Sequence, residues 1–262
     1  MDETLSSAEL TVMAAALGSN ASPWIEDSTL LELDRPILAR RLAGAREGLE
    51  LRGIAESRPD GSLRVLPPYD GLLQDALSAA IGFELQLTQA GGPAERLQAG
   101  MASGGWVVHR WLAGDEHLFY RAAGPAALEA EVMGLGGVHL PARAEAREYV
   151  LPRDVMEALA RQPAEPEEAL RAMLAGAGVA SGDVNAILRS GLAPRSQCVF
   201  WSIGLLGTAV QARVLMWFSD AETSWLIANF DASGQIRLQA ADEPAVRRAV
   251  NSVIAAALQP AA

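Results

Sequence analysis

The 262-residue sequence contains no lysine, so arginine supplies all 21 of its basic residues. This absence excludes a Schiff-base lysine and the lysine of a P-loop, and with them two broad classes of enzyme. A single cysteine, Cys198, excludes an internal disulfide bond and any zinc site built from several cysteines. Abundant alanine together with the missing lysine is typical of a GC-rich bacterial genome, which concerns the source of the chain and leaves its function open.

Positive charge is scarce, because the 21 arginines face 32 acidic residues and the net charge is -11. Duplex nucleic acid and anionic membranes both require a basic face, so we expect neither as a partner. Residues 1–4 are acidic and no apolar segment follows them, so we expect no signal peptide. The longest apolar runs, such as residues 214–218, are too short to span a bilayer. We therefore expect a soluble, globular, cytoplasmic protein.

Helix signals recur along the whole chain as capping residues, apolar residues at helical spacing, and glycines after the last turn. They predict helices over residues 5–17, 34–51, 69–80, 126–135, 152–161, 165–175, 181–189 and 242–258. Alternation of apolar and polar residues predicts strands over residues 62–66, 83–89, 106–112, 118–121, 197–206, 211–219, 224–230 and 235–240.

These elements predict an α/β (α+β) fold with a mixed, largely antiparallel sheet. Residues 1–138 and 149–262 each read as helices, a strand meander and one closing helix, so we expect two quasi-symmetric halves in one compact unit. A plainer interpretation is that any α+β chain can be divided into two such halves.

The last four strands allow a prediction of which residues share a face, because residues flanking each tight turn should pair. With turns at residues 207–210, 220–223 and 231–234, one face is apolar and should be core: Ala212, Val214, Met216, Phe218, Trp225, Ile227, Ile236 and Leu238. The other face mixes aromatic residues, amides and arginines, as protein-binding surfaces do. We predict partner contacts there at Arg213, Leu215, Trp217, Phe230, Gln235, Arg237 and Gln239. The alternative is that the protein's own helices cover this face.

Few residues suggest chemistry. His109 and His117 lie on the two arms of one predicted hairpin near Asp115, which suggests a metal site or an unfamiliar active site as an alternative. Cys198 lies in an apolar strand, where a free cysteine is usually a core residue. The glycines of residues 134–137 follow a helix, where a dinucleotide fingerprint must follow a strand. We therefore expect no catalytic site, no cofactor and no metal.

A second alternative is a transcriptional regulator. Residues 1–66 could form a winged helix, with residues 34–51 as recognition helix and residues 58–66 as wing. Five arginines in this segment favour the idea: Arg35, Arg40, Arg41, Arg46 and Arg52. Acidic residues are interleaved with them, which opposes it.

Several features together resemble a known family. They are an early helix at residues 10–17, the stretch Leu49–Ile54 (LELRGI) at the end of a helix, Tyr149–Pro152 (YVLP) opening a helical segment, and paired strands at residues 214–219 and 224–230 before a closing helix. In this order of elements the chain resembles the EspG family, the cytosolic chaperones of type VII secretion.

The resemblance implies an α/β fold with two quasi-symmetric halves around a mixed sheet, and no catalysis. It also implies binding of a helical protein client before export, which in that family is a pair of PE and PPE proteins. Another small helical secretion substrate would take their place in an organism without such pairs. No partner-binding position is transferred from the family to this sequence.

Overall fold

The computed structural model describes residues 4–19, 30, 32–79, 81–112, 114–137, 139–160, 166–206, 209–230 and 235–258. The chain divides into two compact units. Unit 1 comprises residues 1–82 and 97–124, and unit 2 comprises residues 83–96 and 125–262.

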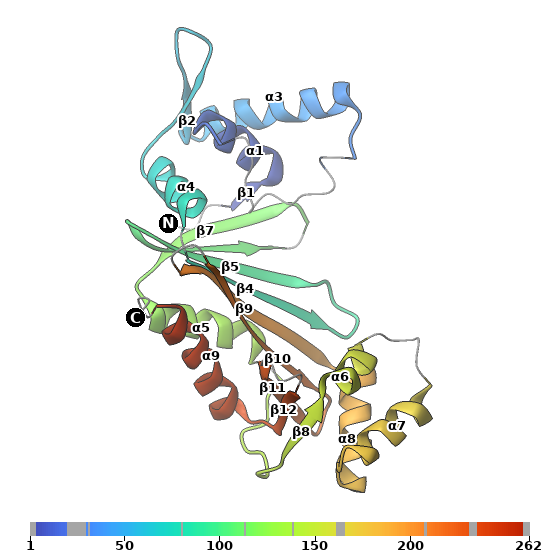
Figure 1. Ribbon diagram of the computed structural model, residues 1–262. Coiled ribbons are helices and arrows are strands. Elements are labelled where there is room, and N and C mark those ends of the chain that lie inside the picture. The colour runs from blue at the N-terminus through green and yellow to red at the C-terminus, as the bar shows by residue number, and fades with distance from the viewer. Residues whose placement is uncertain are drawn as a thin grey trace. The chain divides into compact units, whose positions relative to one another are not determined.

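Unit 1 combines helices with a short sheet and a separate hairpin (Figure 1). Its described helices are α1 (Ser7–Ala16), α3 (Arg35–Leu51) and α4 (Tyr69–Ser78). Its sheet strands lie in the order β1–β7–β6–β5, with bounds β1 (Thr4–Ser6), β5 (Glu95–Ala102, mostly in this unit), β6 (Gly105–Trp111) and β7 (Glu116–Ala122). Strands β2 (Ala55–Ser57) and β3 (Leu63–Val65) pair with each other.

Local signals explain where the helices of unit 1 begin and end. Ser6 caps α1 in a reciprocal capping box, in which Glu9 Oε2 accepts from the Ser6 amide at 2.8 Å. Helix α3 is followed by Gly53, whose φ of 68° suits the left-handed conformation that a glycine adopts without strain. A cluster that includes Leu10, Met13 and Leu49 packs these helices together.

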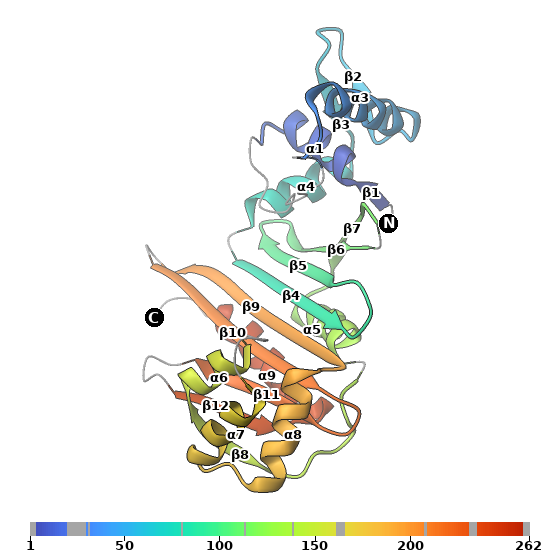
Figure 2. The ribbon, with the colours of Figure 1, turned by 90° about the vertical axis from the view of Figure 1, so that its right-hand side faces the viewer.

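Unit 2 is built on a longer run of strands, in the order β4–β9–β10–β11–β12–β8 (Figure 2). Their bounds are β4 (Ile81–Gln89, in this unit from residue 83), β8 (Glu148–Pro152), β9 (Ser196–Leu206), β10 (Ala209–Ser219), β11 (Ser224–Phe230) and β12 (Gln235–Ala240). The registers from β9 through β12 to β8 are all antiparallel. The described helices of this unit are α5 (Pro125–Gly136), α6 (Arg153–Ala160), α7 (Glu167–Gly176), α8 (Ser181–Leu192) and α9 (Glu243–Ala257).

Helices cover both faces of this part of the sheet. On one face, side chains of α6, α7 and α8 pack on Phe218, Trp225, Ile227, Ile236 and Leu238 in one buried cluster. On the other face, Gly136 at the end of α5 contacts Trp217 and Cys198, and α9 packs against β9, β10 and α5. Strand β10 is therefore enclosed from both sides along its C-terminal half.

The structure confirms the predicted fold class, and each predicted helix lies within three residues of its expected ends. The strands that the sequence did not predict include β5. Leu97, Gln98, Ala99 and Gly100 of this strand are all buried, so it lacks the apolar–polar alternation that would indicate a strand. The predicted registers of β10 with β11 and of β11 with most of β12 are confirmed. The predicted turn at residues 231–234, and residues 207–208 of another, lie outside the described residues. Residues 209–210 were expected in that second turn, but they belong to β10 and pair with Leu206 and Leu205, so the predicted four-residue turn is wrong. The quasi-symmetry of the two sequence halves stays a prediction.

Candidate partner-binding surface

The predicted partner-binding face is largely closed at its centre. Leu215 and Trp217 are buried, and Trp217 Nε1 donates a hydrogen bond to the carbonyl oxygen of Gly136 at 2.9 Å. The protein's own helices thus cover these two positions, which was the stated alternative for this face. Leu215 and Trp217 are therefore corrected from surface to core residues, because their apolar side chains stabilise the packing of α5 and α9 on the sheet.

The polar members of the predicted set lie differently. Arg213, Gln235 and Arg237 are exposed, and Gln239 is half-buried. Arg237 Nε lies 3.3 Å from Glu148 Oε1, and both side chains are about half exposed, so this ion pair contributes little stability. These residues remain predicted partner contacts. The side chain of Phe230 lies outside the described residues, and the register shifts between Ala228 and Phe230, which interrupts the alternation used to assign its face.

An exposed apolar strip lies on the opposite face of the β9–β10 hairpin. Ile203 is 48% exposed and pairs with the exposed Ala212, while Val214 is 39% exposed and pairs with the half-buried Trp201. Val199 and Met216, also paired and half-buried, continue the same face. We name this set the β9–β10 strip: Val199, Trp201, Ile203, Ala212, Val214 and Met216.

The strip corrects a second prediction, since Ala212 and Val214 were expected in the core with the rest of their face. The pairing of β9 with β10 is offset by two residues from the predicted one, which leaves each residue on its predicted face, and Phe218, Trp225 and Ile227 on that face are buried. Helices α6, α7 and α8 pack on the parts of the face contributed by β10, β11 and β12 near these residues, and leave the outer end of the hairpin open. Contiguous exposed apolar residues are typical of binding surfaces.

The borders of the strip give it an amphipathic character. At one border, Met216 packs against the buried cluster beneath α6, α7 and α8. At the other, β4 neighbours β9 in the sheet, and stacking of Phe83 on Phe200 assigns both rings to the face opposite the strip. By alternation, Glu84, Gln86 and Thr88 share the face of the strip. Arg96 Nε donates to Glu84 Oε1 at 2.5 Å, so a charged and hydrogen-bonded border adjoins the apolar residues.

The histidines form a buried chain rather than an open site. His109 Nε2 and His117 Nδ1 are 2.9 Å apart, and His117 Nε2 lies 2.7 Å from the hydroxyl oxygen of Ser7. His109, His117 and Ser7 are all at most 2% exposed, so a substrate has no access to them. Asp115, which the sequence placed near the histidines, forms an ion pair with Arg41 instead. In the described part of the chain, no three His, Cys, Asp or Glu side chains are grouped so that they could hold a metal ion.

Cys198 is a core residue. Burial, with a smaller effect of Glu95, raises the pKa of its thiol far above the usual range. A thiol that stays protonated is a poor nucleophile, so this cysteine suits packing rather than chemistry.

Among the described residues, no helix is both long enough and apolar enough to cross a membrane.

Comparison with known proteins gives a likeness of fold. No family model matches the chain, and no curated protein matches it. Among solved structures, the chain is similar to the Mycobacterium tuberculosis type VII secretion system chaperone EspG5 in its complex with the PE25–PPE41 dimer, with a TM-score of 0.72 and 16% sequence identity. The match covers 100% of this chain and 98% of that chain. At this identity the likeness concerns the fold, and the chain has the fold of the EspG5 chaperone.

Proposed function

We propose that this protein is a non-catalytic chaperone or adaptor that binds a helical secretion substrate in the cytosol. The single observation that carries the proposal is the β9–β10 strip, whose apolar side chains lie open on a sheet beside a layer of helices. The client docks the apolar face of a helix on Trp201, Ile203 and Val214. The polar residues beside that face of the client contact the border of the strip at Glu84 and Arg96.

Physical reasoning favours a helical client. An amphipathic helix presents a stripe of apolar side chains with polar residues on either side, which complements an apolar strip with a charged border. An extended strand would instead need an open sheet edge for its backbone hydrogen bonds. In the strip, β9 lies between β4 and β10, and Met216 of β10 pairs with both Val199 and Ile227.

The comparison adds support for the class of client. EspG5 was solved with the PE25–PPE41 dimer bound. We therefore propose a PE/PPE-type pair, or another small helical secretion substrate, as the client of this chain. Arg213, Gln235 and Arg237 on the opposite face are a second proposed set of contacts.

The test is a binding measurement with purified candidate clients. The protein is co-expressed with paired helical secretion substrates encoded in its own genome, and complexes are measured by size-exclusion chromatography with light scattering and then by calorimetry. An Ile203→Asp/Val214→Asp variant should lose at least tenfold in affinity. A Leu51→Asp variant is the matched control, because Leu51 is 82% exposed but lies in α3 of unit 1.

An Arg213→Glu/Arg237→Glu variant separates the two proposed surfaces. If only this variant weakens binding, the client contacts the arginine-bearing face and the strip is not the docking site. If a stoichiometric client binds all three variants as tightly as the parent protein, both surfaces are excluded. If no secretion substrate forms a complex with the parent protein, the chaperone proposal is wrong.

A further inference from the structure

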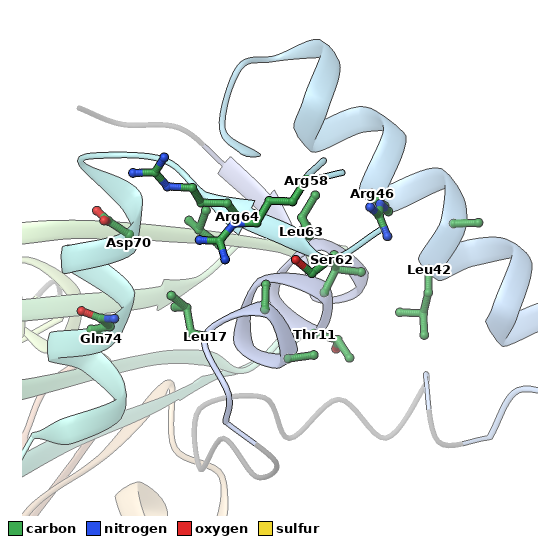
Figure 3. A pocket seen from close by; sticks show the side chains of 15 residues that line it. Thr11, Leu17, Leu42, Arg46, Arg58, Ser62, Leu63, Arg64, Asp70 and Gln74 are labelled. Atoms are coloured by element: carbon green, nitrogen blue, oxygen red, sulfur yellow. The ribbon is translucent and has the colours of Figure 1, made fainter. Parts of the chain in front are cut away.

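A groove in unit 1 has a composition that differs from the rest of this acidic chain. It encloses about 940 Å³ and is lined by α1, α3, α4 and the β2–β3 hairpin (Figure 3). It belongs to unit 1, whereas the β9–β10 strip belongs to unit 2. It therefore requires an explanation of its own.

The floor of the groove is apolar and only half-buried. Helix α1 contributes Val12, Leu17 follows its last residue, α3 contributes Leu42, and the hairpin contributes Leu63. Helix α3 is 17 residues long, yet Leu49 is its only buried residue. Most helices in proteins depend on packing of an apolar face for stability, so a ligand over Leu42 would bury surface that this helix leaves open.

The rim of the groove is cationic. Arg46, Arg58 and Arg64 line it, against one carboxylate, Asp70. This balance is opposite in sign to the net charge of the chain, which is -11. In Figure 3, the side chains of Arg58 and Arg64 reach from the hairpin over the space between Leu17 and the helix that carries Asp70.

The three arginines differ in how far the fold already engages them. Arg46 anchors the hairpin, because its Nη2 donates to Ser57 Oγ at 2.6 Å and to the Gly61 carbonyl oxygen at 2.9 Å. Arg64 pairs with Glu56 at 3.2 Å, but both side chains are about half exposed and the pair can exchange partners at little cost. Arg58 interacts electrostatically with the carboxylate of Asp60 in its own turn, but among the described residues no ion pair joins its guanidinium to a carboxylate, so Arg58 and Arg64 are both available to a ligand.

We propose that this groove binds an acidic amphipathic peptide segment of a second partner protein. Its apolar side chains lie on Val12, Leu42 and Leu63, and its carboxylates pair with Arg58 and Arg64. A guanidinium group binds a carboxylate through two parallel hydrogen bonds, which suits arginine for this task. Duplex DNA fits less well, since an apolar floor offers nothing to a phosphate backbone and Asp70 would repel it.

The test uses a fluorescein-labelled twelve-residue peptide with leucine and glutamate at helical spacing, followed by fluorescence anisotropy with the full-length protein. An Arg58→Glu/Arg64→Glu variant should weaken binding at least tenfold. This variant keeps Arg46 and both substituted residues are exposed, so the hairpin should stay folded, which thermal unfolding checks. The control is Arg237→Glu, an exposed arginine of unit 2, which should bind the peptide like the parent protein.

Two further probes make the result decisive. A Leu42→Asp variant should also weaken binding, and a peptide with lysine in place of glutamate should not bind. The proposal is overturned if the parent protein fails to bind the acidic peptide at millimolar concentration, or if the charge-reversed variant binds it equally well. Tighter binding of a labelled DNA duplex than of the peptide would also overturn it, and would favour a winged-helix role for α3 and the hairpin.

Discussion

Gly136, the last residue of α5, accepts a hydrogen bond from the indole nitrogen of Trp217 on β10 at 2.9 Å. The contact is close enough to require a glycine. A Cβ atom at this position would lie 2.4 Å from Trp217 Cζ2 and 3.2 Å from Cys198 Sγ. Since α5 ends directly on the sheet here, this pair fixes the distance between the helix and β10.

The first prediction is that Gly136→Ala destabilises the protein. The added methyl group must displace the buried Trp217 ring, and overpacking of this kind costs about 1–3 kcal/mol. Urea unfolding followed by tryptophan fluorescence measures the free energy of unfolding. The matched control is Gly134→Ala in the same helix, where the added Cβ meets nothing within 4 Å beyond the neighbouring backbone of its own helix. That change should stabilise the helix by about 0.5–1 kcal/mol, because alanine loses less entropy on folding. Equal stabilities for the two variants would contradict the close contact.

The second prediction concerns Trp217 itself. Because the ring is fully buried, Trp217→Ala should cost about 3–5 kcal/mol of unfolding free energy. Trp217→Phe should cost less, although it leaves the Gly136 carbonyl without its indole donor. Any loss of client binding in Trp217→Ala would therefore follow from lost stability. If this variant has the stability of the parent protein but loses its client, Trp217 is a contact residue and the buried position is wrong.

The alternation in the C-terminal strands was enough to predict which residues share a face. Trp217 pairs with Leu226, and Phe218 pairs with Trp225, as expected from the four-residue turn between them. The sequence could not predict which part of each face the helices cover. Ile203 and Phe218 lie on the same face and are similarly apolar, yet Ile203 is exposed because α6, α7 and α8 pack farther along the sheet.

Other parts of the structure depend on contacts between residues distant in sequence. In the sequence, Trp217 fits a partner-binding surface. Only the fold places Gly136, 81 residues earlier in the chain, against its ring. Glu84 lies on a predicted strand and Arg96 on β5, which the sequence did not predict, and only the fold pairs them at the border of the strip. The groove of unit 1 likewise combines α1, α3, α4 and a hairpin, and no single segment signals it.

The third prediction is a pH dependence of stability through Asp220. Burial alone would raise the pKa of this carboxyl group, but hydrogen bonds from Arg189 and from the amides of Glu222 and Thr223 lower it from 3.8 to about 2. A group whose pKa is lower in the folded state stabilises the fold above its unfolded pKa. That contribution is lost as pH falls from about 4 towards 2.

An Asp220→Asn variant measures this contribution. At pH 7 it should be less stable than the parent protein by an amount on the order of 2 kcal/mol, and the difference should shrink as the pH falls below about 4. Urea unfolding at a series of pH values gives the comparison. Glu222→Gln is the control, because Glu222 pairs with the same Arg189 but is largely exposed. A difference between parent and Asp220→Asn that stays constant from pH 7 to pH 2.5 would show that the pKa of Asp220 is not lowered.

The last prediction concerns the buried chain of Ser7, His117 and His109, which ties the start of α1 to β6 and β7. His117 bridges the other two, so His117→Phe leaves two buried polar side chains without that partner. A buried polar group without its partner costs about 1–3 kcal/mol, and we expect a loss of stability in this range or slightly above it. Ser7→Ala should cost less, since it removes only one end of the chain.

A double-mutant cycle between Ser7→Ala and His117→Phe checks the connection. The double variant should be more stable than the sum of the two single losses predicts. With Ser7 already changed to alanine, His117→Phe no longer leaves a buried Ser7 hydroxyl without its partner. His139→Phe is the control, since His139 is half-buried and lies outside this chain. Strictly additive effects of the two changes would mean that Ser7 and His117 do not interact, and α1 would then be held to β7 by β1 pairing and apolar contacts alone.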